Sequence, residues 1–211
     1  MAQEAAGSDL SHSFTDLMTS LAVIFILLLV ATLNNSFSEG DAAIVDLRKE
    51  VTAELAKLNL TLSQDPDDPY THLINLDEEK VKFDSNKDIL KPEGRVLIDN
   101  LFAVLAPKLC DERLYSKLES VIIEGHTDVT GNETIDGKLW NVKLSQDRAY
   151  AVMHEAFTAL GKGKSENVEC LRQLVSATGR GSNRPLKNRL NSANRRVEVK
   201  IRVKSGYRAP T

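Results

Sequence analysis

The residue whose side chain most clearly suggests a chemical function is an acid inside an apolar segment. Residues 14–33 read FTDLMTSLAVIFILLLVATL, and Asp16 is the one ionisable residue among them. Ionisable side chains within membrane spans are costly and usually belong to a path for ions or protons. Thr19 follows Asp16 by one helical turn, so the acid and this hydroxyl share a helix face. We therefore predict an ion relay at Asp16 and Thr19, because a carboxylate can take a proton or coordinate a hard cation.

A second interpretation of Asp16 needs no ion path. Ser13 could cap a helix whose first turn carries Asp16, and the helix dipole would then hold this carboxylate in the headgroup layer. The sequence leaves both interpretations open.

The apolar segment itself is long enough to anchor the chain in a membrane. Leu17 to Leu33 carries no charge and covers about 26 Å at roughly 1.5 Å per residue, against a hydrocarbon core of ~30 Å. We therefore place a transmembrane helix at residues 13–34, after a short N-terminus at residues 1–12. A cleaved signal peptide fits less well, because the first 16 residues hold three acids and no Lys or Arg.

The next segment has the pattern of a helix followed by a break. Apolar residues recur at steps of three and four from Ile44 to Leu62, which predicts an amphipathic helix that could form a short coil with a second copy. The sequence DPDDP at 65–69 should end it. We therefore predict a helical linker at 35–69, a folded domain at 70–205 and a C-terminal tail at 206–211.

Periodicity within the domain alternates between strand and helix. Strands are predicted at 80–84, 118–128, 174–181 and 195–203, and helices from Pro92 and at 144–160. This order predicts an α+β fold with one mixed sheet backed by helices, and with the last strand at the sheet edge.

Composition and motifs argue against several functional classes. The 211 residues carry a net charge of −3, so there is no overall attraction to nucleic acid, although ten Lys or Arg and one acid follow residue 179. Such a basic end could form a nucleic-acid patch, contact an anionic glycan or form a solvated strand face. No catalytic signature occurs, and the four His residues are scattered. We therefore expect no enzymatic activity, no cofactor and no metal site.

The two cysteines could form a disulfide, or they could remain unpaired with one buried and one in a loop. Cys110 and Cys170 each lie in a connection that leads from a predicted main helix back into a strand. In a right-handed strand–helix–strand arrangement, such connections fall at the same edge of the sheet. We predict a Cys110–Cys170 disulfide, which an oxidising compartment would favour.

Five segments of the domain follow one known pattern in order. They read FDSNKDILKPEG (83–94), IIEGHTDVTG (122–131), NVKLSQDRAYAV (141–152), ATGRGSNRP (177–185) and NRRVEVKI (194–201). Together they resemble the OmpA-like peptidoglycan-binding domain over residues 77–203. The resemblance implies a periplasmic domain that holds the diaminopimelate part of the peptide stem, with Asp128 and Arg148 as its ligand-binding residues.

The chemistry of a zwitterionic ligand suits these two residues. Asp128 could bind the ammonium, and Arg148 the carboxylate, through its fork of N–H donors. The residues expected to line the same cleft are Thr127, Asn141, Asn194, Arg195 and Arg196. The segment between Asp128 and Asn141 is longer than is usual in the family.

Two simpler pairings compete with this site. Arg148 could instead pair with Asp147 or Glu155 on its own helix, and Arg196 could pair with Glu198.

The complete arrangement of an anchor with one early acid, a helical linker and an OmpA-like domain resembles MotB-type stator subunits. The short start and the span are similar to ZorB-type subunits of the Zorya anti-phage defence system. This resemblance implies a homodimer within a ZorA-like multi-span partner, five copies to two of this chain. It also implies ion conduction, with protons favoured over sodium, and a bacterial inner-membrane protein with a cytoplasmic N-terminus.

Three functional classes remain open at this stage. The first is this ion-conducting, wall-anchored subunit, whether of the flagellar MotB type or of the anti-phage type. The second is a passive envelope anchor of the OmpA or Pal kind, which needs no buried acid. The third is a wall-active enzyme, for which the sequence offers neither nucleophile nor metal constellation.

Overall fold

The computed structural model describes the backbone of residues 2–84, 87–162, 165–186 and 191–204, and the side chains within these ranges except 2–13, 34–44, 165 and 191. The chain divides into an N-terminal unit up to Asp41 and a compact unit, Ala42–Lys204, which we call the domain. The predicted tail at 206–211 lies outside the described residues.

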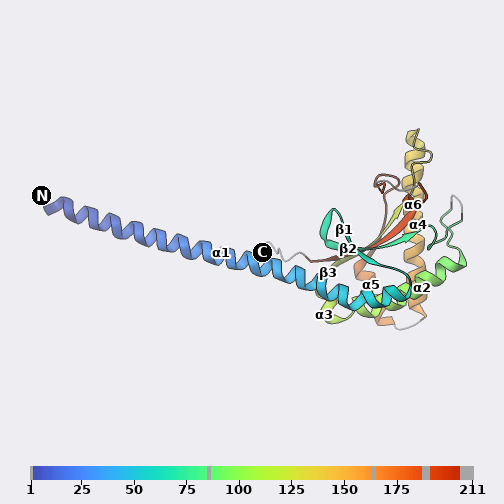
Figure 1. Ribbon diagram of the computed structural model, residues 1–211, viewed down its shortest axis with the longest axis horizontal. Coiled ribbons are helices and arrows are strands. Elements are labelled where there is room, and N and C mark those ends of the chain that lie inside the picture. The colour runs from blue at the N-terminus through green and yellow to red at the C-terminus, as the bar shows by residue number, and fades with distance from the viewer. Residues whose placement is uncertain (1, 85–86, 163–164, 187–190, 205–211) are drawn as a thin grey trace. The chain divides into compact units, whose positions relative to one another are not determined.

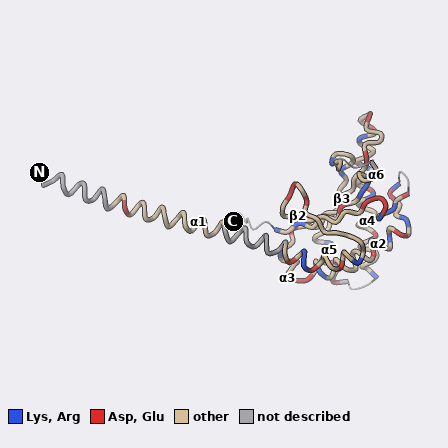
Figure 2. The backbone as a smooth tube through the Cα atoms, viewed as in Figure 1, with Lys and Arg blue, Asp and Glu red and all other residues tan. Residues whose placement is uncertain are grey.

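The N-terminal unit belongs to one long helix, α1 (Ala2–Lys57). Residues Phe14–Leu33 have a mean hydropathy of 2.4, and the side chains of this stretch are exposed. Figure 2 shows that the described part of this stretch is almost free of charge. By length and composition, the segment can cross a membrane, which agrees with the predicted span.

The end of α1 belongs to the domain and is not a linker. Leu47, Val51 and Leu55 have no exposed surface and form part of the hydrophobic core. Their spacing of four residues creates a single stripe, and the domain buries that stripe. Glu50 on the same helix pairs with Lys108 at 3.1 Å. The predicted domain start at residue 70 is therefore wrong, because the core extends back into α1.

The DPDDP sequence forms a turn within the sheet. Strands β1 (Leu62–Asp65) and β2 (Asp68–Asp77) pair antiparallel, and the Asp65 carboxylate accepts the backbone N–H of Asp67 between them. The proline at position 66 suits such a turn. The strand predicted at 80–84 is also wrong, since the bridge Phe83–Leu90 is the β pairing found in its described part.

The sheet has the order β1-β2-β5-β3-β4 (Figure 1). Strand β3 (Leu118–His126) is parallel to β4 (Val175–Gly179) and antiparallel to β5 (Arg196–Val203). The mixed sheet confirms the predicted fold class. However, β5 is the central strand and is buried on both faces, so its predicted edge position is wrong. Three of its charged residues, Arg196, Glu198 and Lys200, are buried in ion pairs, whereas the Arg202 side chain is 43% exposed.

Helices cover one face of the sheet. Helix α4 (Ile135–Gly161) packs against β3 and β4, α5 (Ser165–Leu174) contacts β3, and α2 (Pro92–Leu109) packs against α4 and α5. The two remaining helices, α3 (Glu112–Tyr115) and α6 (Asn191–Asn194), have four residues each. Helix α4 begins nine residues before the predicted start at 144. Its close approach requires Gly125 and Gly179, because a Cβ at either position would lie within 2.4 Å of α4 backbone atoms.

A disulfide joins two of the helices. Cys110, directly after α2, is bonded to Cys170 in α5, with their Cα atoms 5.9 Å apart. This is the pairing that the sequence analysis predicts, although Cys170 lies in a helix and not in an irregular connection. The disulfide ties α2 to the segment that leads from α4 into β4.

Candidate functional site

A cleft of about 540 Å³ opens where β3 ends and α4 begins. It is lined by Glu78, Thr127, Asp128, Thr130, Gly131, Trp140, Asn141, Leu144, Arg148 and Arg195. Strand β3 delivers the acid, α4 delivers the aromatic ring and one guanidinium, and the start of β5 delivers the other guanidinium.

Asp128 follows the last residue of β3 by two positions and is 7% exposed. Its Oδ2 accepts a hydrogen bond from Arg195 Nη1 at 2.6 Å, and its Oδ1 accepts one from the backbone N–H of Thr130 at 3.0 Å. Burial alone would raise the pKa of the Asp128 carboxyl, but these hydrogen bonds outweigh burial and hold the pKa below its usual value. Asp128 is therefore a carboxylate at neutral pH.

Arg148 lies on the inner face of α4 and is 6% exposed. Its Nε donates to the backbone carbonyl of Lys87 at 3.0 Å, and its guanidinium carbon lies 5.0 Å from the centre of the Phe83 ring. Burial lowers the pKa of this guanidinium, which remains charged at neutral pH.

The simpler pairings proposed for Arg148 are not present. Asp147 pairs with Lys143, and Glu155 lies 3.5 Å from Arg95. Within the described part of the chain, Arg148 has no carboxylate in salt-bridge contact. Its Nη donors are therefore available to a ligand that enters the cleft.

Arg195 joins the two acids of the cleft. Its Nη2 lies 2.6 Å from Glu78 Oε2, in addition to its contact with Asp128. Both acids raise the pKa of the Arg195 guanidinium. Arg195 therefore holds Asp128 in place.

Asn141 and Thr127 also lie at the cleft, as predicted. The Asn141 amide donates to the Thr130 carbonyl at 2.8 Å and to Asn132 Oδ1 at 3.0 Å, so it braces the loop after β3. The Thr127 hydroxyl is buried and has no hydrogen-bond partner among the described residues.

Two predicted cleft residues lie elsewhere. Arg196 is buried and its Nε donates to Glu198 at 2.7 Å, which is the simpler pairing considered for it. Asn194 accepts the backbone N–H of Leu186 and is not among the cleft residues. Arg195 lies just before β5 and reaches the cleft, whereas Arg196, the first residue of β5, pairs with Glu198.

Comparisons with known proteins place this geometry in a known fold. No protein-family model matches the chain. It is 32% identical over 123 residues to outer membrane protein A of Bordetella avium and 29% identical over 133 residues to that of Serratia odorifera, matches that cover 56% and 58% of the chain. The chain spans about half the length of these curated relatives, 52% and 48%.

A solved structure extends the comparison to the backbone. The crystal structure of a protein described as MotB-like from Desulfovibrio vulgaris matches 80% of this chain and 99% of its own, with 19% identity and a TM-score of 0.54. The domain has an OmpA-like fold.

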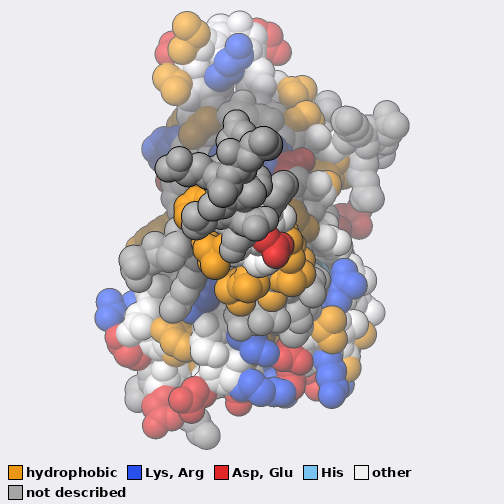
Figure 3. All heavy atoms as spheres, turned by 90° about the vertical axis from the view of Figure 1, so that its left-hand side faces the viewer, with side chains coloured by type: hydrophobic (Ala, Val, Ile, Leu, Met, Phe, Trp, Pro, Cys, Tyr) orange, Lys and Arg blue, Asp and Glu red, His pale blue; other side chains and the backbone are white. Residues whose placement is uncertain are grey.

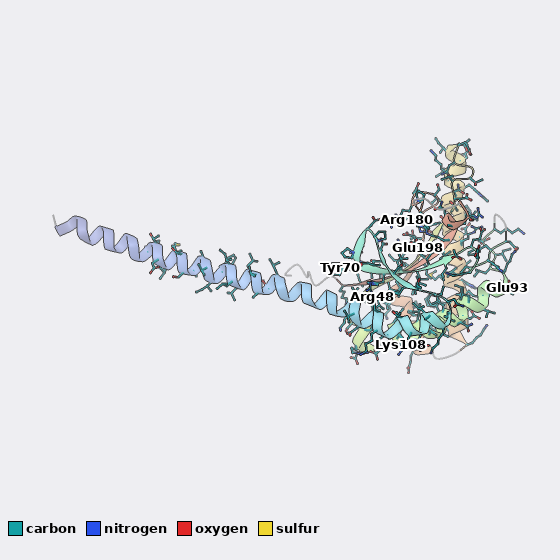
Figure 4. All side chains as sticks on the ribbon, viewed as in Figure 1. Arg48, Tyr70, Glu93, Lys108, Arg180 and Glu198 are labelled. Carbon is teal, nitrogen blue, oxygen red and sulfur yellow. A yellow bond between two sulfur atoms is a disulfide. The ribbon has the colours of Figure 1, made fainter. Side chains whose placement is uncertain are left out.

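The OmpA-like domain contains a second group of charges, on the sheet face opposite the helices. We call it the buried ionic cluster, and it comprises Asp65, Glu124, His126, Arg196, Glu198 and Lys200. Lys200 Nζ lies 2.7 Å from Glu124 Oε1 and 3.4 Å from Glu198 Oε2. Arg180 contacts Glu124 from the rim at 2.9 Å, and Figure 4 labels it together with Glu198.

Electrostatics within the buried ionic cluster favour ionised carboxylates. Burial alone would raise the pKa of Glu198, but contacts with His126 and Arg196 lower it to about 2. Burial also opposes ionisation of Glu124, yet His126, Lys200 and Arg180 together hold its pKa well below the usual value.

Three members of the cluster have metal-ligand chemistry. The ligand atoms of Glu124, His126 and Glu198 lie within 4.8 Å of one another. Lys200 pairs with both carboxylates and Arg196 with Glu198, whereas the two ring nitrogens of His126 have no hydrogen-bond partner among the described residues.

The sequence analysis overlooked five residues of the cleft lining: Glu78, Thr130, Gly131, Trp140 and Leu144. A usable signal existed for two of them, because Trp140, Leu144 and Arg148 are spaced by four and share one helix stripe. Glu78 carries no comparable signal, since it is 117 residues from its partner Arg195.

The predicted relay residues lie in the N-terminal unit. Asp16 and Thr19 occupy successive turns of α1, and the Thr19 hydroxyl donates to the backbone carbonyl of Thr15. Their function is considered below as a proposal.

Proposed function

We propose that the OmpA-like domain binds peptidoglycan through the cleft. Arg148 binds the carboxylate, and Asp128 the ammonium, of the zwitterionic end of a diaminopimelate side chain. The observation that carries this proposal is the presence, in one cleft, of an ionised acid and a guanidinium with no carboxylate partner in the described part of the chain.

The ion pair between Arg195 and Asp128 is compatible with ligand binding. An ionised carboxylate offers about four lone-pair positions, so Asp128 can keep Arg195 and still accept from an ammonium group. The acids Glu78 and Asp128 balance the cations Arg148 and Arg195. A cleft with balanced charge suits a zwitterion better than a purely anionic or cationic ligand.

The test is cosedimentation of the full chain, in detergent, with purified cell-wall sacculi. Asp128→Ala and Arg148→Ala should each lower affinity by about tenfold or more, because each leaves one ligand charge unpaired. Lys143→Ala is the matched control, since Lys143 lies on the outer surface of α4 with its side chain 65% exposed. Wild-type affinity in both cleft variants would refute the proposal.

We propose further that α1 anchors the chain in the bacterial inner membrane, with the domain in the periplasm. The apolar stretch Phe14–Leu33 supports a single span, and an OmpA-like fold suits a compartment that contains the wall. The disulfide also supports a periplasmic location of the domain, because structural disulfides persist in oxidising compartments.

The more specific proposal is a stator-like subunit that conducts ions with a ZorA-like multi-span partner, in anti-phage defence. Two copies of this chain would sit within five of the partner, and Asp16 would relay protons. What supports this is the acid inside the apolar stretch, together with the fold shared with a MotB-like protein.

Asp16→Asn tests this proposal in cells that carry the complete system. The amide keeps the shape but not the titratable charge, so assembly should persist while protection against phage is lost. Thr32→Val is the control, since it changes one hydroxyl near the other end of the span. Full protection with Asp16→Asn, and no multi-span partner on copurification, would favour a passive anchor of the OmpA or Pal kind.

A further inference from the structure

The start of α4 forms an apolar extension of the domain. Ile135, Leu139 and Trp140 are 75%, 61% and 54% exposed, and Figure 3 shows hydrophobic side chains at this end of the domain, at the top of the view. Large exposed apolar side chains that gather in this way usually mark a binding site. Of these three residues, Trp140 lines the cleft.

The extension is held firmly against the loop after β3. Gly137 packs so closely on the carbonyl of Gly131 that a Cβ at residue 137 would lie 1.6 Å from that oxygen. The Asn141 amide bonds to the same loop through Thr130 and Asn132. Trp140 is therefore presented by a braced helix, which lowers the entropy cost of using its ring in binding.

The distance between the Trp140 ring and Arg148 can be compared with the length of a peptidoglycan stem. Trp140 and Arg148 are eight residues apart on α4, or about 12 Å along its axis. In a peptidoglycan stem, two residues separate diaminopimelate from the sugar, and they span about 7 Å when extended at ~3.5 Å each. The γ-linkage of the glutamate and the lactyl ether lengthen this path further. A stem bound at Arg148 is therefore long enough to bring its sugar to the region of Trp140.

We infer that Trp140 forms a second subsite in the cleft, which binds the amino sugar that carries the peptide stem. The negative face of the indole attracts the C–H groups on the apolar face of a pyranose ring, and Leu144, between Trp140 and Arg148 on the helix stripe, supplies apolar contact along the stem. The inference rests on the proposed function, because the position of the sugar is set by the stem end at Asp128 and Arg148.

The experiment compares two soluble probes on the full chain in detergent. One is the disaccharide-tripeptide that contains diaminopimelate, and the other is the same tripeptide without sugar. Wild-type protein should bind the disaccharide-tripeptide about tenfold more tightly. Trp140→Ala should remove this difference, measured as the ratio of the two affinities, and Trp140→Phe should restore part of it.

Two further measurements separate a binding role from a structural one. Trp140 is the single tryptophan of the chain, so its fluorescence reports on this position alone. The disaccharide-tripeptide should shift or quench this emission, while the tripeptide should change it little. Leu139→Ala is the control, because Leu139 belongs to the exposed extension but not to the cleft lining.

The outcomes also separate this inference from the proposed function. Equal binding of both probes by wild-type protein, or an equal loss of both in Trp140→Ala, would overturn the sugar subsite and leave the stem site standing. Binding of neither probe would overturn the proposed function and the subsite with it.

Discussion

The buried ionic cluster and the cleft are built from the same kinds of charged side chains, but in the cluster these charges pair with one another, whereas in the cleft one of them is open to a ligand. Both pair Arg or Lys with carboxylates, and both lie on residues contributed by β3 and β5 or by the positions just beyond them. In the buried ionic cluster, Lys200 and Arg196 contact every carboxylate of the set, and these side chains are at most 8% exposed. In the cleft, Arg148 has a backbone carbonyl as its partner and faces a volume of about 540 Å³.

The difference lies in which charges are already satisfied. Buried charges whose partners are all within the protein maintain the sheet, and removing one partner leaves another charge stranded. A charge with unused donors at an open volume can bind a ligand instead. The cluster should therefore respond to mutation through stability, and the cleft through affinity.

The largest effect is expected from Lys200→Ala. This substitution removes the buried cation shared by Glu124, Glu198 and Asp65, all of which lie within 3.4 Å of Lys200 Nζ. The free energy of unfolding, measured by denaturant titration, should fall by about 3–5 kcal/mol. For Lys143→Ala, which breaks an exposed pair on α4, we expect a loss of less than about 1 kcal/mol. Similar losses in the two variants would remove the distinction between buried and open charges.

The next effect is a pH dependence of stability that originates in the buried ionic cluster. The pKa of Glu198 is about 2 in the folded domain against a usual value of 4.5, so the unfolded chain binds more protons between these values. Stability should be fully present above about pH 4.5 and fall as the pH approaches 2, by roughly 3 kcal/mol from this group. Glu124 acts in the same direction.

Glu198→Gln is the variant that isolates this contribution. It should be less stable than wild type at pH 7 but lose less stability between pH 4.5 and 2, as followed by denaturant titration at several pH values. If the free energy of unfolding of Glu198→Gln fell with pH as steeply as that of wild type, the loss of stability in acid would originate in other carboxylates.

In the cleft, mutation should change ligand affinity more than stability. Asp128→Asn keeps the shape of the side chain but removes its charge, so it should weaken cell-wall binding by about tenfold. The free energy of unfolding should change by about 1 kcal/mol, because one ion pair with the one-third-exposed Arg195 side chain is lost. A larger loss of stability than of affinity would show that Asp128 belongs to the structural charges.

The smallest effect is expected from Arg148→Lys. The ammonium of lysine keeps the charge but cannot form a two-pronged contact with a carboxylate. Affinity for sacculi should fall by only about threefold, clearly less than in Arg148→Ala. Equal affinities for Arg148→Lys and Arg148→Ala would mean that geometry, and not charge, governs this contact.

Short-range patterns in the sequence were enough to predict much of the architecture. The helix that opens at Pro92, the strand at β3 and the apolar stretch before residue 34 all follow from periodicity or composition within one segment. The pairing of Cys110 with Cys170 also follows, because the connections that carry them are constrained by the handedness of chain crossovers. The resemblance to a known family also named Asp128, Arg148 and Arg195, and all three line the cleft, while their role in ligand binding stays a prediction.

The remaining features depend on contacts between segments that are distant in the chain. The alternation in β5 is the same for an edge strand and for a central one, and pairing with both β2 and β3 places Arg196, Glu198 and Lys200 in the interior. The sequence predicts the apolar stripe of Leu47, Val51 and Leu55, but it does not reveal which part of the domain packs on this stripe. The pairing of Glu78 with Arg195 joins residues 117 positions apart. Side-chain periodicity records which face of an element is buried or polar, but only the packed fold supplies the partner that the face meets.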